Sequence, residues 1–245
     1  MLVFIVPLKS ARGADSWEQV SKLFCRTIAS ACAQTSAEFR IVVACHEIPQ
    51  GDFSNPNLEF IQVPYPAPST ASFSDLRLDK KRKRFTAFTR AVEYSPSHVM
   101  FLDADDLVSN RLAQFVADHS SENGWYLRSG YFFCEKQALL HRERWRFHKW
   151  CGSSYIVRPE HLAFLLGTDD RILYSHRWLD REMRRHGTPL RPLPFSGAIY
   201  TVAHGDSFRD YESLLWPSHP VMGPLRRMIF HRPVTPQIQQ EFGLA

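Results

Sequence analysis

The segment His98-Val99-Met100-Phe101-Leu102-Asp103-Ala104-Asp105-Asp106 joins an apolar run to three carboxylates. A short run of this kind is typical of a strand that is buried on both faces of a parallel sheet. In open α/β sheets, ligands bind beyond the carboxyl ends of the strands. The segment therefore predicts a buried strand that ends at a ligand site.

Other apolar runs predict parallel neighbours for this strand. They cover residues 2–7 and 39–44, and a shorter run, 58–63, lies within a proline-rich stretch, 50–74, that we expect to be largely loop. Helical spacing of apolar residues predicts one helix from Trp17 to Ala31, capped by Asp15 or Ser16, and another from about Asp79 to Tyr94. This alternation predicts an α/β fold with a Rossmann-like, doubly wound, mostly parallel central sheet flanked by helices.

The second half of the chain is less regular. Helices are expected over residues 110–119 and 177–186, with aromatic-rich segments over 125–133 and 144–157. The tail, 211–245, mixes basic, aromatic and proline residues without sustained helical periodicity. It predicts a strap packed on the domain or, alternatively, a segment that contacts a membrane surface.

Composition limits the class of protein. The 245 residues, 44% hydrophobic and 22% charged, suffice for one packed domain and exclude a disordered or fibrous chain. No apolar run approaches the ~20 residues that span a bilayer, and the first residues lack the basic region of a signal peptide. The five cysteines include no Cys-x-x-Cys pair, which argues against zinc and fits reduced thiols. We expect a cytoplasmic protein, peripheral to the inner face of the membrane if the tail contacts lipid.

The charge balance favours an anionic partner. The formal charge is +5 and the pI is near 9.0, which suits nucleic acid, a membrane surface or a diphosphate. The densest basic run is Lys80-Lys81-Arg82-Lys83-Arg84. On a helix Lys80, Lys83 and Arg84 share one face and Arg82 points elsewhere, so the run is either a phosphate contact or a solvated helix face.

The three carboxylates of residues 103–106 suggest a metal. Crowded carboxylates repel one another, and a hard divalent cation such as Mg²⁺ or Mn²⁺ removes that repulsion. The alternative is an Asp-rich turn in which one carboxylate, with Asp106 as the candidate, caps the next helix.

These motifs resemble a known family. Ile5-Val6-Pro7 and Phe101-Leu102-Asp103-Ala104-Asp105-Asp106 are similar to strand openings of family-2-type inverting glycosyltransferases. The resemblance covers residues 1–120; later motifs are similar in order only, namely Gly152-Ser153-Ser154, Trp178-Leu179-Asp180 and Ala203-His204-Gly205-Asp206. It implies a GT-A fold, a nucleotide-sugar donor, with UDP-sugar expected, and Mn²⁺ or Mg²⁺.

The resemblance also implies roles for particular residues. Asp105 is the expected direct metal ligand, with Asp103 near the ion or the ribose and His204 as a further ligand. Lys80, Lys83 and Arg84 remain alternatives for the cationic residue that faces the donor. The expected donor contacts are Pro7, Leu8, Glu47, Lys80, Lys83, Arg84, Asp103 and Ala104.

Inverting transfer also needs a general base. Asp180 is the candidate, with Asp169, Asp170 and Glu182 as rivals and a surface ion pair as the alternative role. The acceptor is expected to contact a turn and its aromatic neighbour, namely Trp150, Gly152, Ser153 and Ser154, although Trp150 could equally belong to the core.

The resemblance implies one GT-A catalytic domain over residues 1–210, in which 1–120 form the nucleotide-sugar half and 121–210 the acceptor half. The acceptor is expected to be a carbohydrate or glycolipid, and no nucleic-acid partner is expected. Two alternatives remain at this stage: a nucleotidyltransferase, and a non-catalytic carbohydrate or nucleic-acid binding module.

Overall fold

The computed structural model describes residues 1–68, 72–134, 139–162, 176–202 and 231–244, and its largest element is a seven-stranded sheet. The strand order is β10-β6-β9-β4-β1-β2-β3, and β4, β1, β2 and β3 run parallel, whereas β9 is antiparallel to β4 and β6. The strands are β1 (Leu2–Pro7), β2 (Phe39–Cys45), β3 (Leu58–Gln62), β4 (His98–Phe101), β6 (Gly124–Tyr126), β9 (Tyr155–Val157) and β10 (Arg191–Pro192). The predicted α/β architecture with a mostly parallel central sheet is confirmed.

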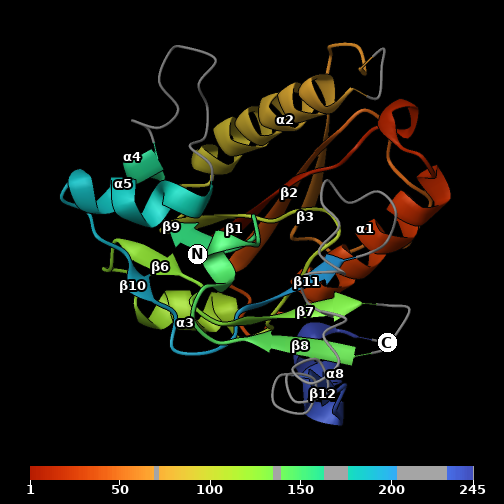
Figure 1. The fold of residues 1–245 in the computed structure, drawn as a ribbon. Helices are drawn as coiled ribbons and strands as arrows, with labels where there is room; N and C mark the ends of the chain where they lie inside the picture. Colours follow the sequence, from red (N-terminus) through yellow and green to blue (C-terminus); the bar gives the residue numbers. More distant parts are fainter. Residues whose placement is uncertain (69–71, 135–138, 163–175, 203–230, 245) are drawn as a thin grey trace.

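Helices cover both faces of this sheet (Figure 1). On one face lie α1 (Trp17–Cys32) and α3 (Leu112–Asp118); on the other lie α2 (Phe73–Glu93), α4 (Pro159–Leu162) and α5 (Leu179–Arg185). Side chains of a strand alternate between its faces. Phe4 of β1 accordingly packs in the core cluster that holds α1 and α3, whereas Val3 and Ile5 pack in the cluster that holds α2.

A second sheet lies against the α1 side of the molecule (Figure 1). Its order is β12-β8-β7-β11-β5, with strands β5 (Leu107–Val108), β7 (Gly130–Cys134), β8 (Leu139–Glu143), β11 (Ala198–Val202) and β12 (His231–Pro233). The sequence marked parts of it only as aromatic-rich segments. Because β5 follows directly on residues 103–106 and pairs with β11, this sheet joins the acidic segment to late parts of the chain.

Several expected element boundaries are wrong. The second long helix begins at Phe73 rather than Asp79, because the Ser72 side chain accepts a hydrogen bond from the Asp75 amide and starts the helix in a stretch expected to be loop. Asp106 caps no helix, since α3 begins after Arg111 without a side-chain cap. The expectation that Asp15 or Ser16 caps α1 is confirmed, with Ser16 as the cap.

The tail also differs from expectation. Residues Pro236–Phe242 form a helix, α8, which the lack of periodicity did not predict. Thr235 caps its first turn and Gly243, with φ of 66°, ends it. Phe242 and Leu244 are buried against Leu107, Phe133 and Ile199, so α8 packs on the second sheet. The tail segment 211–230 lies outside the described residues.

A buried lysine fixes α2 to the end of β1. Lys83 Nζ donates to the Leu8 carbonyl at 2.7 Å and pairs with Asp79 Oδ2 at 2.7 Å, and its side chain is buried. Burial lowers the pKa of Lys83, and the Asp79 carboxylate opposes that effect. The opposite face of α2 exposes Leu78, Phe85 and Val92. The helix therefore buries a charge pair and exposes apolar side chains.

Among the described helices, we find none that combines the length and apolar character of a membrane span.

Gly124 opens β6 in a conformation that other residues avoid. Its φ is +133°, and a Cβ placed there would lie 2.2 Å from the Ile156 carbonyl oxygen of the paired strand β9. We expect Gly124→Ala to lower the free energy of unfolding by about 3 kcal/mol or more, a fall in Tm of about 6–12 °C. Thermal and urea unfolding measure this effect.

Gly187→Ala is the matched control, because Gly187 also has positive φ, +75°, but nothing lies within 4 Å of its would-be Cβ. Strain alone should cost about 1–2 kcal/mol there. Equal losses in the two variants would contradict the close approach of β6 and β9.

Candidate functional site

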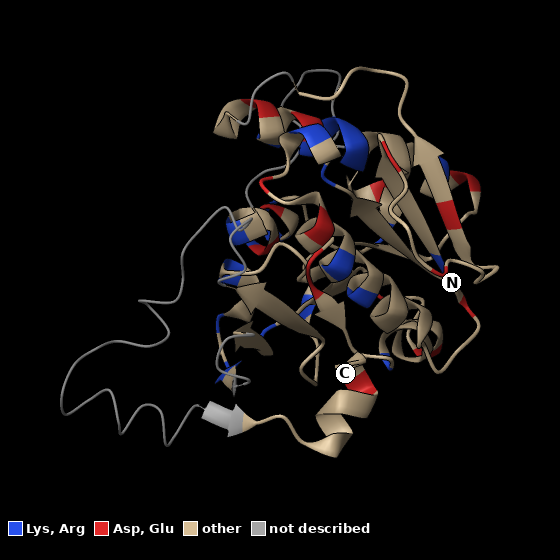
Figure 2. Ribbon diagram, turned by 90° about the vertical axis from the view of Figure 1, so that its right-hand side faces the viewer, with Lys and Arg blue, Asp and Glu red and all other residues tan. Residues whose placement is uncertain are grey.

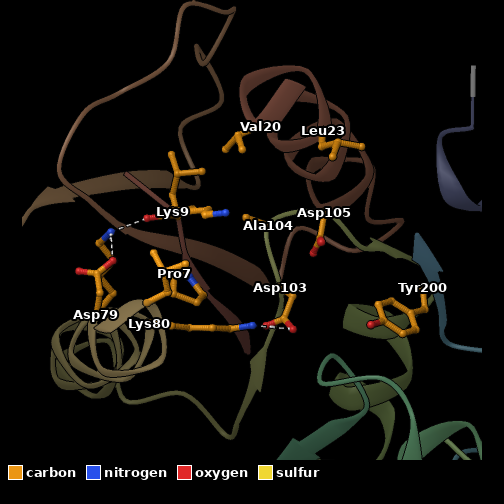
Figure 3. A pocket seen from close by; sticks show the side chains of 13 residues that line it. Pro7, Lys9, Val20, Leu23, Asp79, Lys80, Asp103, Ala104, Asp105 and Tyr200 are labelled. Carbon is orange, nitrogen blue, oxygen red and sulfur yellow. Dashed lines mark hydrogen bonds and ion pairs between the residues drawn. The ribbon is translucent and has the colours of Figure 1, made fainter. Parts of the chain in front are cut away.

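A cavity of about 120 Å³ lies beyond the carboxyl ends of β1 and β4 (Figure 3). The segment after β1, the helices α1 and α2, the acidic segment after β4 and one residue of β11 form its walls. The lining residues are Pro7, Leu8, Lys9, Val20, Leu23, Leu76, Asp79, Lys80, Lys83, Asp103, Ala104, Asp105 and Tyr200. This is the edge of the sheet where ligands of such folds bind.

Two cations of α2 hold the Asp103 carboxylate. Arg84 Nη2 donates to Asp103 Oδ1 at 2.6 Å, and Lys80 Nζ lies 2.9 Å from Oδ2. Burial by itself raises the pKa of Asp103, but the charges and hydrogen bonds of Lys80 and Arg84 bring it below its ordinary value. Figure 2 shows the basic residues of α2 as blue segments of the helix at the top of the view. Asp103 is therefore an ionised group whose two oxygens both face cations.

A buried network fixes the position of Asp103 from behind. Ser153 Oγ accepts from the Asp103 amide at 2.8 Å and donates to Asp106 Oδ2 at 2.6 Å. Asp106 also accepts from the Cys151 thiol and the Thr201 amide. Burial, with the nearby charges of Asp105 and Asp103, raises the pKa of Asp106. Asp106 thus joins the acidic segment to β11 and to the turn before β9.

Gly152 permits the close contact between that turn and the acidic segment. A Cβ at this position would lie 2.7 Å from Asp103 Oδ2. The expected acceptor turn therefore lies directly beside the carboxylate of the expected donor site. Ser153 and Ser154 of the turn are fully buried and bond internally, Ser154 to the Cys151 carbonyl at 2.6 Å.

Asp180 lies at the beginning of α5 in a polar cluster of its own. Lys149 Nζ donates to Asp180 Oδ1 at 2.6 Å, and the Tyr155 hydroxyl donates to the same oxygen at 3.4 Å. His148 Nε2 lies 4.0 Å from Oδ2, and burial lowers the pKa of His148 to about 4. Burial and the Asp180 charge raise the pKa of Tyr155. The carboxylate is half-buried and oriented by a cation.

His176 is a site residue that the sequence did not single out. It lies in a short 3-10 helix, η4 (His176–Trp178), four residues before Asp180. Burial lowers its pKa to about 4, and the charges of Asp103, Arg84 and Lys80 act on it. The segment that carries Asp180 therefore borders the Asp103 cluster.

Two of the described carboxylates, those of Asp103 and Asp105, are candidates to hold a divalent cation. Asp103 and Asp105 line one cavity, but the Asp103 oxygens face Lys80 and Arg84. Within the described ranges, no group of three or more His, Cys, Asp or Glu side chains is placed to hold a metal ion. Mg²⁺ and Mn²⁺ need only one or two carboxylates when phosphate oxygens and water complete the shell, so Asp105 with Asp103 fits an ion that arrives with a phosphate ligand.

The structure brings together most of the residues that the sequence singled out for the donor. Pro7, Leu8, Lys80, Lys83, Asp103, Ala104 and Asp105 line one cavity, and Arg84 contacts Asp103. Glu47 does not line it; its carboxylate accepts from the Ala11 amide at 3.2 Å. Trp150 is half-buried beneath Arg177, whose guanidinium lies 5.8 Å from the ring. His204, Asp169 and Asp170 lie outside the described residues.

Lys9 and Tyr200 also line the cavity and were not predicted. Lys9 is the second residue after the first expected strand, so its position beyond the end of that strand could have predicted its place in the cavity. Tyr200 arrives through the pairing of β11 with β5 and β7, for which the local sequence holds no signal.

No protein-family model matches the chain, and no curated protein matches its sequence. A solved structure, TarS residues 1–349 from S. aureus, shares its fold with a TM-score of 0.51 at 13% identity, over 82% of this chain. The match covers 60% of that TarS chain, which is less than two thirds of its length.

Two further structures are more distant. TarS 1–349 in complex with UDP-GlcNAc aligns with a TM-score of 0.48 at 13% identity, over 85% of this chain and 61% of that one. Rv0371c from Mycobacterium tuberculosis H37Rv aligns with a TM-score of 0.40 at 9% identity, over 88% and 98%. At these scores neither likeness adds to the argument on fold.

Removing the Ser153 hydroxyl should loosen the acidic segment. Ser153→Ala leaves the buried Asp103 amide without its acceptor and Asp106 without its shortest donor. We expect a loss of about 2 kcal/mol in the free energy of unfolding, a fall in Tm of about 4–8 °C.

Ser21→Ala is the control, because the Ser21 hydroxyl only adds a bond to the Trp17 carbonyl within α1. It should change the free energy of unfolding by about 0.5 kcal/mol or less. Urea unfolding of both variants compares the two sites. A Ser153→Ala protein as stable as Ser21→Ala would refute the bridging role of Ser153.

Proposed function

We propose that this chain is a glycosyltransferase that moves a sugar from a nucleoside-diphosphate sugar to an acceptor hydroxyl, with inversion at the anomeric carbon. The observation that carries the proposal is the cavity beyond β1 and β4, which Asp103 and Asp105 line together with Lys9 and Lys80, and beside which Arg84 pairs with Asp103. Such a wall suits a diphosphate and its counter-ion. Synthesis of a polysaccharide or glycoconjugate is the expected setting.

The donor is proposed to be a UDP-sugar. TarS, whose fold this chain shares, has been crystallised with UDP and with UDP-GlcNAc. In the proposal, Pro7, Leu8 and Ala104 line the nucleotide site, and Lys80 and Arg84 meet the diphosphate. Lys83 holds the end of β1 in place. Glu47, whose carboxylate accepts from the Ala11 amide and does not line the cavity, remains a proposed contact of the nucleobase.

A divalent ion, Mn²⁺ or Mg²⁺, is proposed at Asp105 with Asp103 beside it and His204 as a further ligand. When bound, such an ion neutralises the charge that develops on the departing diphosphate. The chain itself contributes further positive charge there, because Lys80 and Arg84 lie within 3 Å of Asp103. The leaving group thus departs into a site that already holds two cations.

Asp180 is proposed as the general base. Lys149 holds its Oδ1 through a 2.6 Å ion pair, which fixes the orientation of the carboxylate. The carboxylate can then take the acceptor's proton as the hydroxyl attacks the anomeric carbon opposite the diphosphate. Gly152 and Trp150 are proposed to meet the acceptor, while the buried Ser153 and Ser154 support their turn.

This assignment places the donor contacts in residues 1–120 and the acceptor contacts in 121–210, within one catalytic domain over residues 1–210. The acceptor is proposed to be a carbohydrate or glycolipid. Contact with a membrane through residues 211–245 remains a proposal of the same kind, supported by the basic and aromatic residues of that segment.

Nucleotide binding tests the donor site directly. We expect UDP to bind the wild type in calorimetry with Mn²⁺ present, and chelation of Mn²⁺ to weaken binding about tenfold or more, because an ion held by Asp105 would screen the carboxylates from the diphosphate. Asp105→Ala should remove this dependence. Asp118→Ala, an exposed carboxylate at the end of α3, should keep it.

A dependence on Mn²⁺ that persists in Asp105→Ala would rule out this metal position. In turnover assays with nucleotide sugars and candidate acceptors, release of the nucleoside diphosphate is expected. Release of pyrophosphate instead would indicate nucleotidyl transfer.

Asp180→Asn tests the base. The amide preserves shape but cannot accept the proton, so kcat should fall about 10²-fold or more while UDP affinity stays within about threefold. Glu160→Gln, which neutralises an exposed carboxylate paired with Arg158, is the control and should leave kcat unchanged. Wild-type turnover in Asp180→Asn would exclude Asp180 as the base, and joint loss of UDP binding would assign it a structural role.

A further inference from the structure

The charges at the end of β4 neutralise one another before any ligand arrives. Arg84 and Lys80 each take one oxygen of Asp103, at 2.6 and 2.9 Å. Both the carboxylate and its cations are thus engaged within the protein.

The two cations come from a helix that is held in place independently of Asp103. Lys80 and Arg84 lie one turn apart on α2, which is fixed by the Lys83 contact with the Leu8 carbonyl and by Ala87 and Phe88 in the core. Only the side chains of Lys80 and Arg84 can therefore change partner. Lys80 is 29% exposed on the cavity side, and the Arg84 Nε–H has no hydrogen-bond partner among the described residues. Arg84 retains capacity to donate to an added anion.

A bare divalent ion and a bare diphosphate each meet an obstacle here. An ion at Asp103 would have to displace two cations or approach them at close range, which Coulomb repulsion disfavours. A diphosphate alone would draw Lys80 and Arg84 away and leave Asp103 unpaired beside an anion. When both bind together, the diphosphate pairs with Lys80 and Arg84, and the divalent ion pairs with the Asp103 carboxylate. Every charge then has a partner of opposite sign.

We propose that Asp103 is an exchangeable counter-ion: the nucleoside diphosphate takes Lys80 and Arg84 from it, and the released carboxylate, with Asp105, then binds the divalent ion. This inference rests on the proposed function, because it assigns the diphosphate and the ion to that same site. It makes their binding free energies positively coupled, and by linkage each raises the affinity of the other by one common factor.

Gly152 is the geometric element that makes the exchange possible. Any side chain there would press on Asp103 Oδ2, the oxygen that Lys80 holds, at 2.7 Å. A bare glycine leaves the carboxylate room to change partner while Ser153 keeps the Asp103 amide in place.

Calorimetry on the full chain, with Mn²⁺ and UDP as probes, measures the coupling. Mn²⁺ should bind the wild type about tenfold or more tightly when UDP saturates the protein, within the usual range of coupling between sites. In Lys80→Met/Arg84→Met, Mn²⁺ alone should bind about fivefold or more tightly than to the wild type, and UDP in chelator should bind more weakly.

The matched control is Lys81→Met/Arg82→Met, which removes the same charge from the same helix. Arg82 is exposed and lies 5.7 Å over the Tyr65 ring, and neither residue contacts Asp103 in the described contacts. This variant should bind Mn²⁺ alone as the wild type does. An equal gain in the control would show a long-range charge effect and overturn the counter-ion proposal.

The remaining outcomes are also decisive. Equal Mn²⁺ affinity with and without UDP, or no gain of Mn²⁺ affinity in Lys80→Met/Arg84→Met, overturns the exchange even if UDP binds and the proposed function stands. If no nucleotide binds under any condition, the proposed function fails, and the Mn²⁺-only comparison still decides whether Lys80 and Arg84 block Asp103. If the double variant does not fold, the affinity for Mn²⁺ alone is compared between Arg84→Met and its control, Arg82→Met.

Discussion

The arrangement of the site depends on the ion pairing of Asp103 at the end of β4. Its carboxylate binds α2 through Arg84 and Lys80, and its amide binds the turn before β9 through Ser153. Because β4 lies in the middle of the central sheet, between β1 and β9, these contacts tie three separate parts of the chain to one point. A buried ion pair stabilises a protein little by itself, but loss of one partner is costly, so the pairing specifies one arrangement.

The helix that supplies the cations breaks the usual rule of amphipathic packing. Lys83 and Asp79 of α2 are buried, whereas Leu78, Phe85 and Val92 are exposed. A helix placed only by its apolar residues would turn a different face to the sheet. The pairing of Lys83 with the Leu8 carbonyl and Asp79 compensates for its burial. With α2 in this orientation, Lys80 lines the cavity and Arg84 pairs with Asp103. Such local conflicts between pattern and fold are expected at functional sites.

The sequence was informative where a pattern is local. The apolar runs identified β1, β2 and β4, and helical spacing correctly separated Lys80, Lys83 and Arg84 from Arg82, which lies over Tyr65 instead. The sequence could not predict that Lys83 donates to the Leu8 carbonyl whereas Lys80 and Arg84 pair with Asp103. The Lys83 contact depends on the end of a strand more than 70 residues away. The second sheet was missed for the same reason: β5 has two residues, and its partner β11 begins 90 residues later. Tyr200 reaches the site only through such long-range pairing.

Strands from the second half of the chain pair with strands from the first half, and this limits where the chain could be cut into fragments that fold. Strand β9, from residues 155–157, covers the edge of β4 and lies between it and β6, while β5 from the first 120 residues depends on β11 for pairing. A fragment that ended near residue 120 would carry bare edges on β4 and β5, and the complementary fragment would lack the sheet on which its strands assemble. The proposed donor and acceptor contacts are separate in sequence, yet they share one hydrogen-bonded framework. An exchange of residues 121–210 for a segment of another protein would therefore have to preserve β9 and β11. The practical unit for such grafting is the loop between strands rather than the half of the chain.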